Sequence, residues 1–318
     1  MSNGWNYEKA QELFSQPFQD LLFAAHSLHR QHFCPNTLQI SSLVSIKTGG
    51  CSENCGYCSQ SSYHPGGLKR EPMLSVNAVK EAAARAKEAG ATRLCMGASG
   101  RSPRAVELQA ICEMIQVVKE MGLETCATLG LLNELQVEDL KKAGLDYYNH
   151  NIDTSPEYYS QVVTTRTFQD RLQTLDYVRK AGLKICCGGI LGMGESNEDR
   201  IRMLLVLACF PKSPESIPIN QLIPIPGTPL AHASALDPFD FVRTIALARL
   251  MMPTSSIRLS AGRETMSDEL QALCFFVGAN SVFYGEKLLT ANNSSIAKDD
   301  LLFSRLQLSK SLVYSQTT

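Results

Sequence analysis

Short apolar runs and longer amphipathic segments alternate along most of this chain of 318 residues. The short runs predict strands, whereas the longer segments have the spacing of helices that bury one face. The predicted strands span residues 43–46, 93–96, 124–128, 147–149, 184–190, 216–222, 256–259 and 280–284. The predicted helices between them span 76–89, 103–121, 136–143, 166–181, 197–210 and 238–251.

Glycine follows four consecutive predicted helices, at Gly90, Gly122, Gly144 and Gly182. Glycine is favoured at this position because it adopts the left-handed conformation that closes a helix without a steric penalty. These four residues therefore mark the carboxyl ends of the helices.

The alternation of strand and helix predicts an α/β fold of the (β/α)8 TIM-barrel type, which typically needs about 250 residues. A doubly wound open sheet gives the same alternation and remains an alternative. The first strand–helix turn lacks the G-x-G-x-x-G pattern of a dinucleotide-binding fold. We expect one domain over residues 1–318, with a barrel core at about 38–288, an N-terminal helical extension at 6–33 and a loosely attached polar tail at 291–318.

The composition indicates which kinds of partner the protein is not expected to bind. A net charge of −1 does not favour a nucleic-acid surface, which needs a basic stripe. No apolar run approaches the roughly 20 residues that a membrane helix requires. Eleven cysteines are scattered through a chain without a recognisable secretion signal, which indicates a reducing environment. We therefore expect a cytoplasmic protein with neither a membrane nor a nucleic-acid partner.

Three cysteines lie close together directly after the first predicted strand. Cys51, Cys55 and Cys58 have the spacing C-x3-C-x2-C, which in a reduced chain favours metal binding over disulfides. A structural zinc site needs a fourth ligand, for which His64 is a candidate. Three thiolates on an iron–sulfur cubane would instead leave one iron open to a small molecule. An open iron–sulfur site is the favoured interpretation, with zinc or free thiols as alternatives.

Further cysteines stand near the carboxyl ends of the predicted strands, where the active site of a barrel lies. Cys95, Cys126 and Cys186 fall on the second, third and fifth strands, so they either form a second metal centre or pack as small hydrophobes. Successive side chains of a strand alternate between its faces, so Cys186 should point inward and Cys187 outward. Arg258, on the seventh strand, has no lone pair for a metal and suggests a carboxylate clamp or an electrostatic partner.

Two other polar groups allow more than one interpretation. Asn151 and Asp153 follow the fourth strand and would either bind a polar ligand or cap the next helix. His26, His29 and His32 repeat every third residue in the N-terminal extension. They would form either a metal site or, preferably, a partly exposed helix face.

The cysteine motif, with Tyr57 before its last cysteine, resembles the signature of the radical S-adenosylmethionine (AdoMet) superfamily. Within that superfamily the chain resembles the biotin synthase family from about residue 5 to about residue 290. The matching segments are Ser45-Ile-Lys-Thr-Gly49, Cys95-Met-Gly-Ala98, Tyr148-Asn-His-Asn-Ile-Asp-Thr154, Thr164-Thr-Arg-Thr167 and Ser260-Ala-Gly-Arg-Glu264.

The resemblance implies a TIM-type barrel that inserts sulfur between C6 and C9 of dethiobiotin to give biotin. It assigns a [4Fe–4S] cluster to Cys51, Cys55 and Cys58, and a [2Fe–2S] cluster to Cys95, Cys126, Cys186 and Arg258. It assigns AdoMet contacts to Tyr57, Arg171, Ile190 and Asn220, and contacts with the ureido ring of dethiobiotin to Asn151 and Asp153. It also implies a flavodoxin- or ferredoxin-type electron donor and a homodimer.

Two alternative functions are compatible with an iron–sulfur site, and the chain departs from the family pattern at two positions. A lipoyl synthase-like enzyme would carry a second cysteine triplet near its N-terminus, where this chain has only Cys34. An iron–sulfur electron carrier would need neither AdoMet-binding elements nor a barrel of this size. Gly100 stands where the family usually has an aromatic residue, and Cys187 where a smaller residue is expected.

Overall fold

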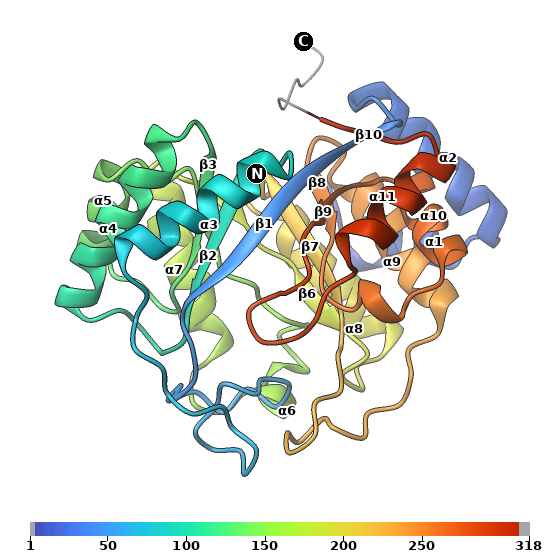
Figure 1. The fold of residues 1–318 in the computed structure, drawn as a ribbon. Coiled ribbons are helices and arrows are strands. Elements are labelled where there is room, and N and C mark those ends of the chain that lie inside the picture. Colours follow the sequence, from blue (N-terminus) through green and yellow to red (C-terminus); the bar gives the residue numbers. More distant parts are fainter. Residues whose placement is uncertain (1–3, 312–318) are drawn as a thin grey trace.

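The computed structural model describes residues 4–311. A ring of parallel strands is surrounded by helices, and the ring is closed because β1 pairs with both β2 and β9 (Figure 1). The strands of the ring are β1 (Thr37–Lys47), β2 (Arg93–Ala98), β3 (Glu124–Thr128), β4 (Tyr147–Asn149), β5 (Lys184–Cys186), β6 (Gly189–Leu191), β7 (Ser216–Gln221), β8 (Ser256–Leu259) and β9 (Ala279–Phe283). With β5 and β6 taken as one interrupted strand, the barrel has the predicted (β/α)8 architecture, and the open-sheet alternative is wrong.

The helices form an outer layer. They are α3 (Val76–Glu88), α4 (Ala105–Glu120), α5 (Glu134–Lys142), α7 (Phe168–Lys180), α8 (Asn197–Ala208), α9 (Pro238–Met251) and α10 (Asp268–Phe276), with a 3-10 turn, η1, at Arg263–Thr265. The short α6 (Tyr159–Val162) lies instead beside the loop that follows β1, where the Gly56 N–H donates to the Val162 carbonyl (Figure 1). The predicted extension consists of α1 (Tyr7–Phe14) and α2 (Phe18–His32), which pack against α8 and α9. The four predicted C-cap glycines all have positive φ, between 74° and 95°. None of the helices among residues 4–311 is long and apolar enough to span a bilayer.

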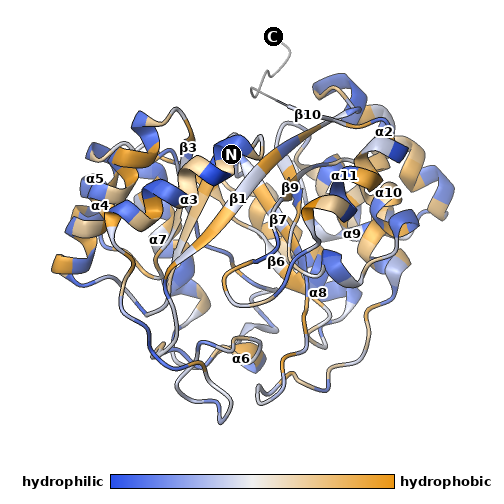
Figure 2. Ribbon diagram, in the orientation of Figure 1, coloured by the Kyte–Doolittle hydropathy of each residue, from blue (hydrophilic) through white to orange (hydrophobic). Residues whose placement is uncertain are grey.

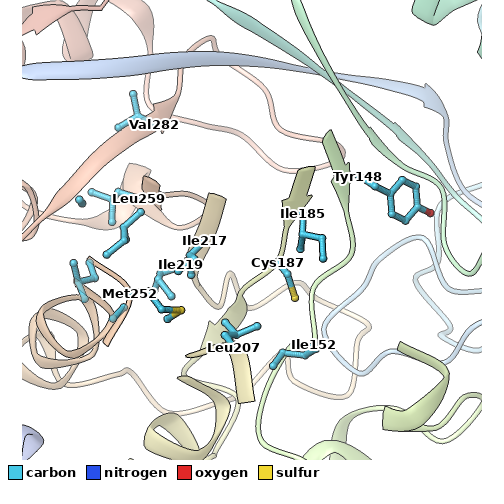
Figure 3. Close-up of a cluster of buried hydrophobic side chains, with 14 of the residues drawn as sticks. Tyr148, Ile152, Ile185, Cys187, Leu207, Ile217, Ile219, Met252, Leu259 and Val282 are labelled. Atoms are coloured by element: carbon cyan, nitrogen blue, oxygen red, sulfur yellow. The ribbon is translucent and has the colours of Figure 1, made fainter. Parts of the chain in front are cut away.

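The apolar core lies between the strands and the helices. Residues of the sheet that face outward, such as Ile185, Ile217 and Leu259, pack with helix residues such as Leu207 (Figure 3). Hydrophilic and hydrophobic residues alternate along the helices, as in amphipathic helices that bury one face (Figure 2). The barrel interior is therefore left to a separate, largely polar set of side chains.

The predicted fifth strand, 184–190, is interrupted between β5 and β6. Opposite the break stands Pro218 of β7, which has no N–H to donate to a ladder. Gly188 approaches this proline so closely that a Cβ atom would lie 2.0 Å from the Pro218 carbonyl oxygen. The continuous strand prediction is wrong because a tertiary contact between distant residues breaks the ladder.

The prediction of a loosely attached tail is also wrong for residues 291–311. The last helix, α11 (Ile296–Arg305), buries Leu302 and Phe303. Strand β10 (Ser309–Lys310) then pairs with β1. The remaining residues of the predicted tail, 312–318, lie outside the described part of the chain. The sequence prediction missed α11 because its amphipathic pattern is short and is flanked by polar segments.

The three histidines of α2 do not share one environment. His29 is buried, and burial lowers its pKa to about 3. His26 is half-buried and lies 2.7 Å, through Nδ1, from the carbonyl oxygen of Phe276. The expected partly exposed face describes His26 and His32 but is wrong for His29. Among the described residues no three His, Cys, Asp or Glu side chains are placed to hold a single metal ion, so the metal alternative has no support.

The buried ion pair between Arg263 and Asp299 should fix α11 to the barrel. The pair is bidentate, at 2.6 and 3.2 Å, and both side chains are almost fully buried. Replacing Asp299 with Ala leaves a buried guanidinium unpaired and should lower the free energy of unfolding by about 3–5 kcal/mol. Urea denaturation followed by circular dichroism would measure the change.

A suitable control is Leu301→Ala on the same helix, because Leu301 is 61% exposed. This substitution should change stability by only about 0.5 kcal/mol. Equal effects of the two substitutions would show that the ion pair does not hold the helix.

Candidate active site

A cavity of about 330 Å³ opens at the carboxyl ends of the strands. It extends from the cysteine motif at its mouth to thiols in the barrel interior. Of the predicted site residues, those lining the cavity are Cys51, Cys55, Tyr57, Cys58, Cys95, Cys126, Asn151, Asp153, Arg171, Ile190, Asn220 and Arg258. Cys186 does not line it and is fully buried beside the two inner cysteines. The fold thus brings all the predicted site residues together.

The cysteine motif forms a braced loop after β1. The Cys51 N–H donates to the Gln60 carbonyl at 2.8 Å, and the Cys58 N–H donates to the Cys55 carbonyl at 3.0 Å. Gly49 begins the loop with φ of 73°, and a Cβ there would lie 2.2 Å from the Lys69 carbonyl oxygen. Glycine is therefore required for the close packing that folds this loop back on itself.

His64 is not placed as a fourth ligand. Its Nε2 atom lies 2.9 Å from the Cys55 carbonyl oxygen, so the ring braces the backbone of the loop. The zinc site considered from the sequence therefore has no support. The thiolates of an iron–sulfur cluster bind different irons and need not converge on one ion.

The guanidinium of Arg166, which was not among the predicted site residues, lies beside the Cys55 thiol. Burial raises the pKa of Cys55, and raises that of Cys58 to about 12. Arg166 opposes this effect at Cys55, because its Nη2 atom is 3.4 Å from the sulfur. Metal binding requires thiolates, so a nearby guanidinium favours the ligand form. Arg166 stands within the Thr164–Thr167 segment, which was the only sequence signal for it.

Glu53 holds this region in place. Its carboxylate accepts from Arg101 at 2.9 Å and also from the Thr165 hydroxyl, and it lies 3.9 Å from Arg166. Since Glu53 belongs to the cysteine loop and Thr165 precedes α7, the contact joins two sides of the cavity mouth. Gly100 is nearby with φ of 131°, a conformation that an aromatic residue would rarely adopt. The residue that departs from the family pattern therefore lies in a loop whose backbone conformation favours glycine.

The inner cysteines, Cys95, Cys126 and Cys186, form a second group that we call the thiol layer. Cys95 and Cys126 are register partners on β2 and β3. The Cys126 thiol is hydrogen-bonded to both neighbours, which lowers the pKa of Cys95 and Cys186 and raises that of Cys126. Asn149 Nδ2 lies 3.2 Å from the Cys186 sulfur. Three buried thiols joined by hydrogen bonds are a chemically suitable ligand set for a metal cluster.

Arg258 is completely buried beside the thiol layer. It donates to the hydroxyls of Ser281 and Ser41, at 3.1 and 3.0 Å, and its Nη1 atom is 4.0 Å from the Cys186 sulfur. Its guanidinium also lies over the Phe283 ring, 4.7 Å from the ring centroid. This arrangement agrees with an electrostatic partner of sulfur at the base of the cavity.

The inward and outward assignment of the adjacent cysteines is confirmed. Cys186 groups with the thiol layer, whereas Cys187 joins the apolar core outside the sheet. Figure 3 shows Cys187 among Ile152, Ile185 and Leu207.

Asp153 and Arg171 form a buried ion pair within the cavity wall. The Asp153 Oδ2 atom accepts from Arg171 and from the Tyr57 hydroxyl, the latter at 3.0 Å. Arg171 also donates to Tyr159 at 2.9 Å. Arg171 is therefore an interior residue and not part of a surface ion pair. The capping alternative for Asn151 and Asp153 is wrong, because the next helix, α6, has Tyr158 at its N-cap.

Two asparagines fix the backbone around β6. Asn151 accepts from the Gly188 N–H at 3.1 Å. Asn220 donates to the Gly189 carbonyl at 2.9 Å and accepts from the Ala261 N–H at 3.1 Å. Ile190 lies between these contacts and lines the cavity. The amides thereby hold one wall of the cavity in a fixed shape.

The Asp153–Arg171 pair should be essential for stability. Arg171→Met keeps the length of the side chain but leaves a buried carboxylate without its cation, which should cost about 3–5 kcal/mol. Arg202→Met is the control, because the side chains of the Arg202–Glu198 pair are 35% and 54% exposed and the pair should contribute about 1 kcal/mol or less. Urea denaturation of both variants would test the difference, and equal losses would contradict it.

Two family descriptions match consecutive parts of the chain. "Radical SAM superfamily" matches residues 45–208, and "Biotin and Thiamin Synthesis associated domain" matches residues 218–309. Among solved structures, the FeFe-hydrogenase maturase HydG from Carboxydothermus hydrogenoformans has a TM-score of 0.84 at 19% identity, covering 98% of this chain and 77% of that one. Methylornithine synthase (PylB) has a TM-score of 0.81 at 19% identity, covering 97% of this chain and 95% of that one. These two structures support the fold alone.

Curated relatives are much more similar. The biotin synthase of Neorickettsia sennetsu is 61% identical over 308 residues, which is 97% of this chain and 95% of the relative. The biotin synthase of Methylococcus capsulatus is 58% identical over 308 residues, covering 97% and 94%. The matched 308 residues span both cysteine groups and the cavity between them, and the chain belongs to the biotin synthase family of the radical AdoMet superfamily.

Proposed function

We propose that this chain carries out the reaction of its family, the insertion of sulfur between C6 and C9 of dethiobiotin to give biotin, in the cavity described above. The observation that carries the proposal is the presence of two cysteine groups at opposite ends of one cavity. A substrate between them would have one group above it and the other below it. An electron carrier would not need such an enclosed space between two thiol groups.

At the mouth of the cavity, Cys51, Cys55 and Cys58 would hold a [4Fe–4S] cluster with one open iron. The donor set fits, because three thiols lie in a braced loop and His64 is occupied by the backbone. Arg166 would stabilise the thiolate of Cys55.

At the base of the cavity, the thiol layer and Arg258 would hold a [2Fe–2S] cluster. The donor set fits here too, because the three thiols share hydrogen bonds and Arg258 approaches Cys186. Two serines hold the guanidinium by its Nε and Nη2 atoms, which leaves Nη1 directed at the sulfur. A ligand role for arginine remains unusual chemistry, since its protonated form has no lone pair.

When bound, the two clusters and AdoMet supply an electron, a 5′-deoxyadenosyl radical and the inserted sulfur. Radical chemistry is needed because the C–H bonds at C6 and C9 are not acidic, so no side-chain base would remove their hydrogens. The residues of the chain instead bind the reactants, orient them and keep water away from them.

For AdoMet we assign Tyr57, Arg171, Ile190 and Asn220 as the contacting or supporting residues. Asn220 and Ile190 form the wall at β6, and Tyr57 and Arg171 meet at Asp153. For dethiobiotin we assign Asn151 and Asp153. Both contacts of Asp153 with Tyr57 and Arg171 use Oδ2, which leaves Oδ1 for a charge-assisted hydrogen bond to a ureido N–H.

The remaining assignments rest on family membership. We propose a flavodoxin- or ferredoxin-type electron donor, a homodimer and a cytoplasmic location. We also propose that residues 1–318 act as one domain, because α1, α2 and α11 all pack onto the barrel. A lipoyl synthase-like activity is disfavoured by the single cysteine, Cys34, among the N-terminal residues.

Replacing Cys51, Cys55 and Cys58 together with Ala should abolish both AdoMet cleavage and biotin formation. The reason is that no other thiol stands at the cavity mouth among the described residues. Anaerobically reconstituted protein would be incubated with AdoMet, dethiobiotin and a reductant, and deoxyadenosine and biotin would be quantified by mass spectrometry. Continued deoxyadenosine production by the triple variant would contradict the assignment.

The adjacent cysteines of the fifth strand provide a matched pair. Cys186→Ser should lose the second cluster and biotin formation, because it removes an inward-facing ligand. Cys187→Ser should keep both and lose about 1–3 kcal/mol of stability, because it places a hydroxyl in an apolar core. Visible absorption and iron content would distinguish the variants, and the opposite result would reverse the assignment.

A further inference from the structure

The amino-terminal floor of the barrel carries a cluster of charged side chains that the proposed reaction does not use. Arg93 on β2 pairs with Glu124 on β3, with Nη2 and Oε2 2.8 Å apart. Its guanidinium carbon lies 3.5 Å from the ring centroid of Tyr147 on β4. Lys184 on β5 lies 4.9 Å from the same centroid and 3.7 Å from Glu124. We call these four residues the floor cluster.

The floor cluster extends from the thiol layer to the protein surface at the amino ends of the strands. Tyr147 packs directly against the three cysteines and is 5% exposed. Below it, the side chains of Lys184 and Glu124 are 50% and 27% exposed. The floor cluster lies at the amino ends of the strands, whereas the cysteine loop that follows β1 lies at the other end (Figure 1).

Arg93 supplies a buried cationic donor inside this layer. Its side chain is 1% exposed, and its Nε and Nη2 atoms both donate to Glu124. Its Nη1 atom is buried and finds no hydrogen-bond partner among the described residues. An unpaired buried donor on a cation is costly, and a small anion would satisfy it. With Arg93, Lys184 and Glu124 together, the floor cluster has one net positive charge.

We propose that the floor cluster is an anion passage through which hydrosulfide reaches the thiol layer. The inference rests on the proposed function, in which the second cluster loses sulfide to the product and must regain it. Hydrosulfide is a small anion with one heavy atom, so it suits a single unpaired N–H and a route covered by one aromatic ring. The carboxyl-end cavity would meanwhile be filled by the first cluster, AdoMet and substrate.

In this arrangement Lys184 attracts the anion at the surface, Arg93 binds it through Nη1, and Tyr147 covers the opening. The anion enters without forming a bond to the protein. The Tyr147 ring is stacked with the Arg93 guanidinium rather than fixed by the sheet alone. Opening the route requires a side-chain rotation of Tyr147 that breaks this stacking, and no strand has to unfold.

The test follows cluster assembly rather than catalysis. Cluster-free full-length protein is mixed anaerobically with saturating ferrous iron, AdoMet and dethiobiotin, which occupy the carboxyl-end cavity as the first cluster forms, and with a series of sodium sulfide concentrations. Visible absorption and Mössbauer spectra then follow the two clusters separately. Lys184→Gln should raise the sulfide concentration giving half-maximal assembly of the second cluster by about two- to fivefold, as expected for losing one charge near the path. Assembly of the first cluster, at the opposite end, should be unchanged and serves as the internal control.

Lys80→Gln is the matched control variant, because it removes the same charge from an exposed position on α3. It should leave both assembly rates unchanged. Tyr147→Leu should accelerate assembly of the second cluster, because it removes the ring that covers the passage. If Tyr147→Leu does not fold, Lys184→Gln still decides the question, because half of the Lys184 side chain is exposed.

The outcomes separate this inference from the proposed function. Formation of the second cluster with the same sulfide dependence in wild type, Lys184→Gln and Lys80→Gln would overturn the passage and leave the proposed function intact. Failure of the second cluster to form in the wild-type protein would instead overturn the two-cluster assignment. An equal slowing of both clusters in Lys184→Gln would also overturn the passage, because it would indicate a general effect.

Discussion

The buried guanidinium of Arg258 places the strongest constraint on this barrel. A charge without partners in the interior would cost several kcal/mol, so the neighbouring strands must supply acceptors. Ser41 and Ser281 do so from β1 and β9, and Gln39 in turn accepts from Ser281 at 2.6 Å. The strands that close the barrel are therefore joined by a polar side-chain network as well as by their ladder.

This constraint changes what the interior is made of. Barrels of this type usually fill their centre with bulky branched side chains. Here cysteines and polar residues, together with a few bulky side chains such as Tyr147 and Phe283, occupy inward positions, and most branched residues lie on the outer face of the sheet, where the helices cover them. The exchange leaves room for the thiol layer and for a cavity that reaches it. Stability comes mainly from the outer apolar layer, so the inner positions are available for chemistry.

The sequence predicted the elements well where a local pattern decides them. Residues 124–128, 147–149 and 256–259 form strands with the predicted bounds, and strand parity placed Cys186 and Cys187 on opposite faces. The break in the fifth strand and the docking of α11 were missed, because Pro218 and Arg263 act on segments far away in the chain. Local periodicity contains no information on such contacts.

The same distinction explains which site residues the sequence could identify. The cysteines were recognisable by type and spacing, whereas Arg166 and Glu53 act through contacts between the cysteine loop and the segment before α7. Arg93 lacked a signal altogether, since a lone arginine at the start of a strand is usually a surface residue. Arg93 is buried because the ring of strands is closed. Closure turns the inward face of β2 toward Tyr147 on β4, two strands away in the ring. Closure of the barrel therefore creates charged sites at both of its ends, and only the end with a cysteine motif is visible in the sequence.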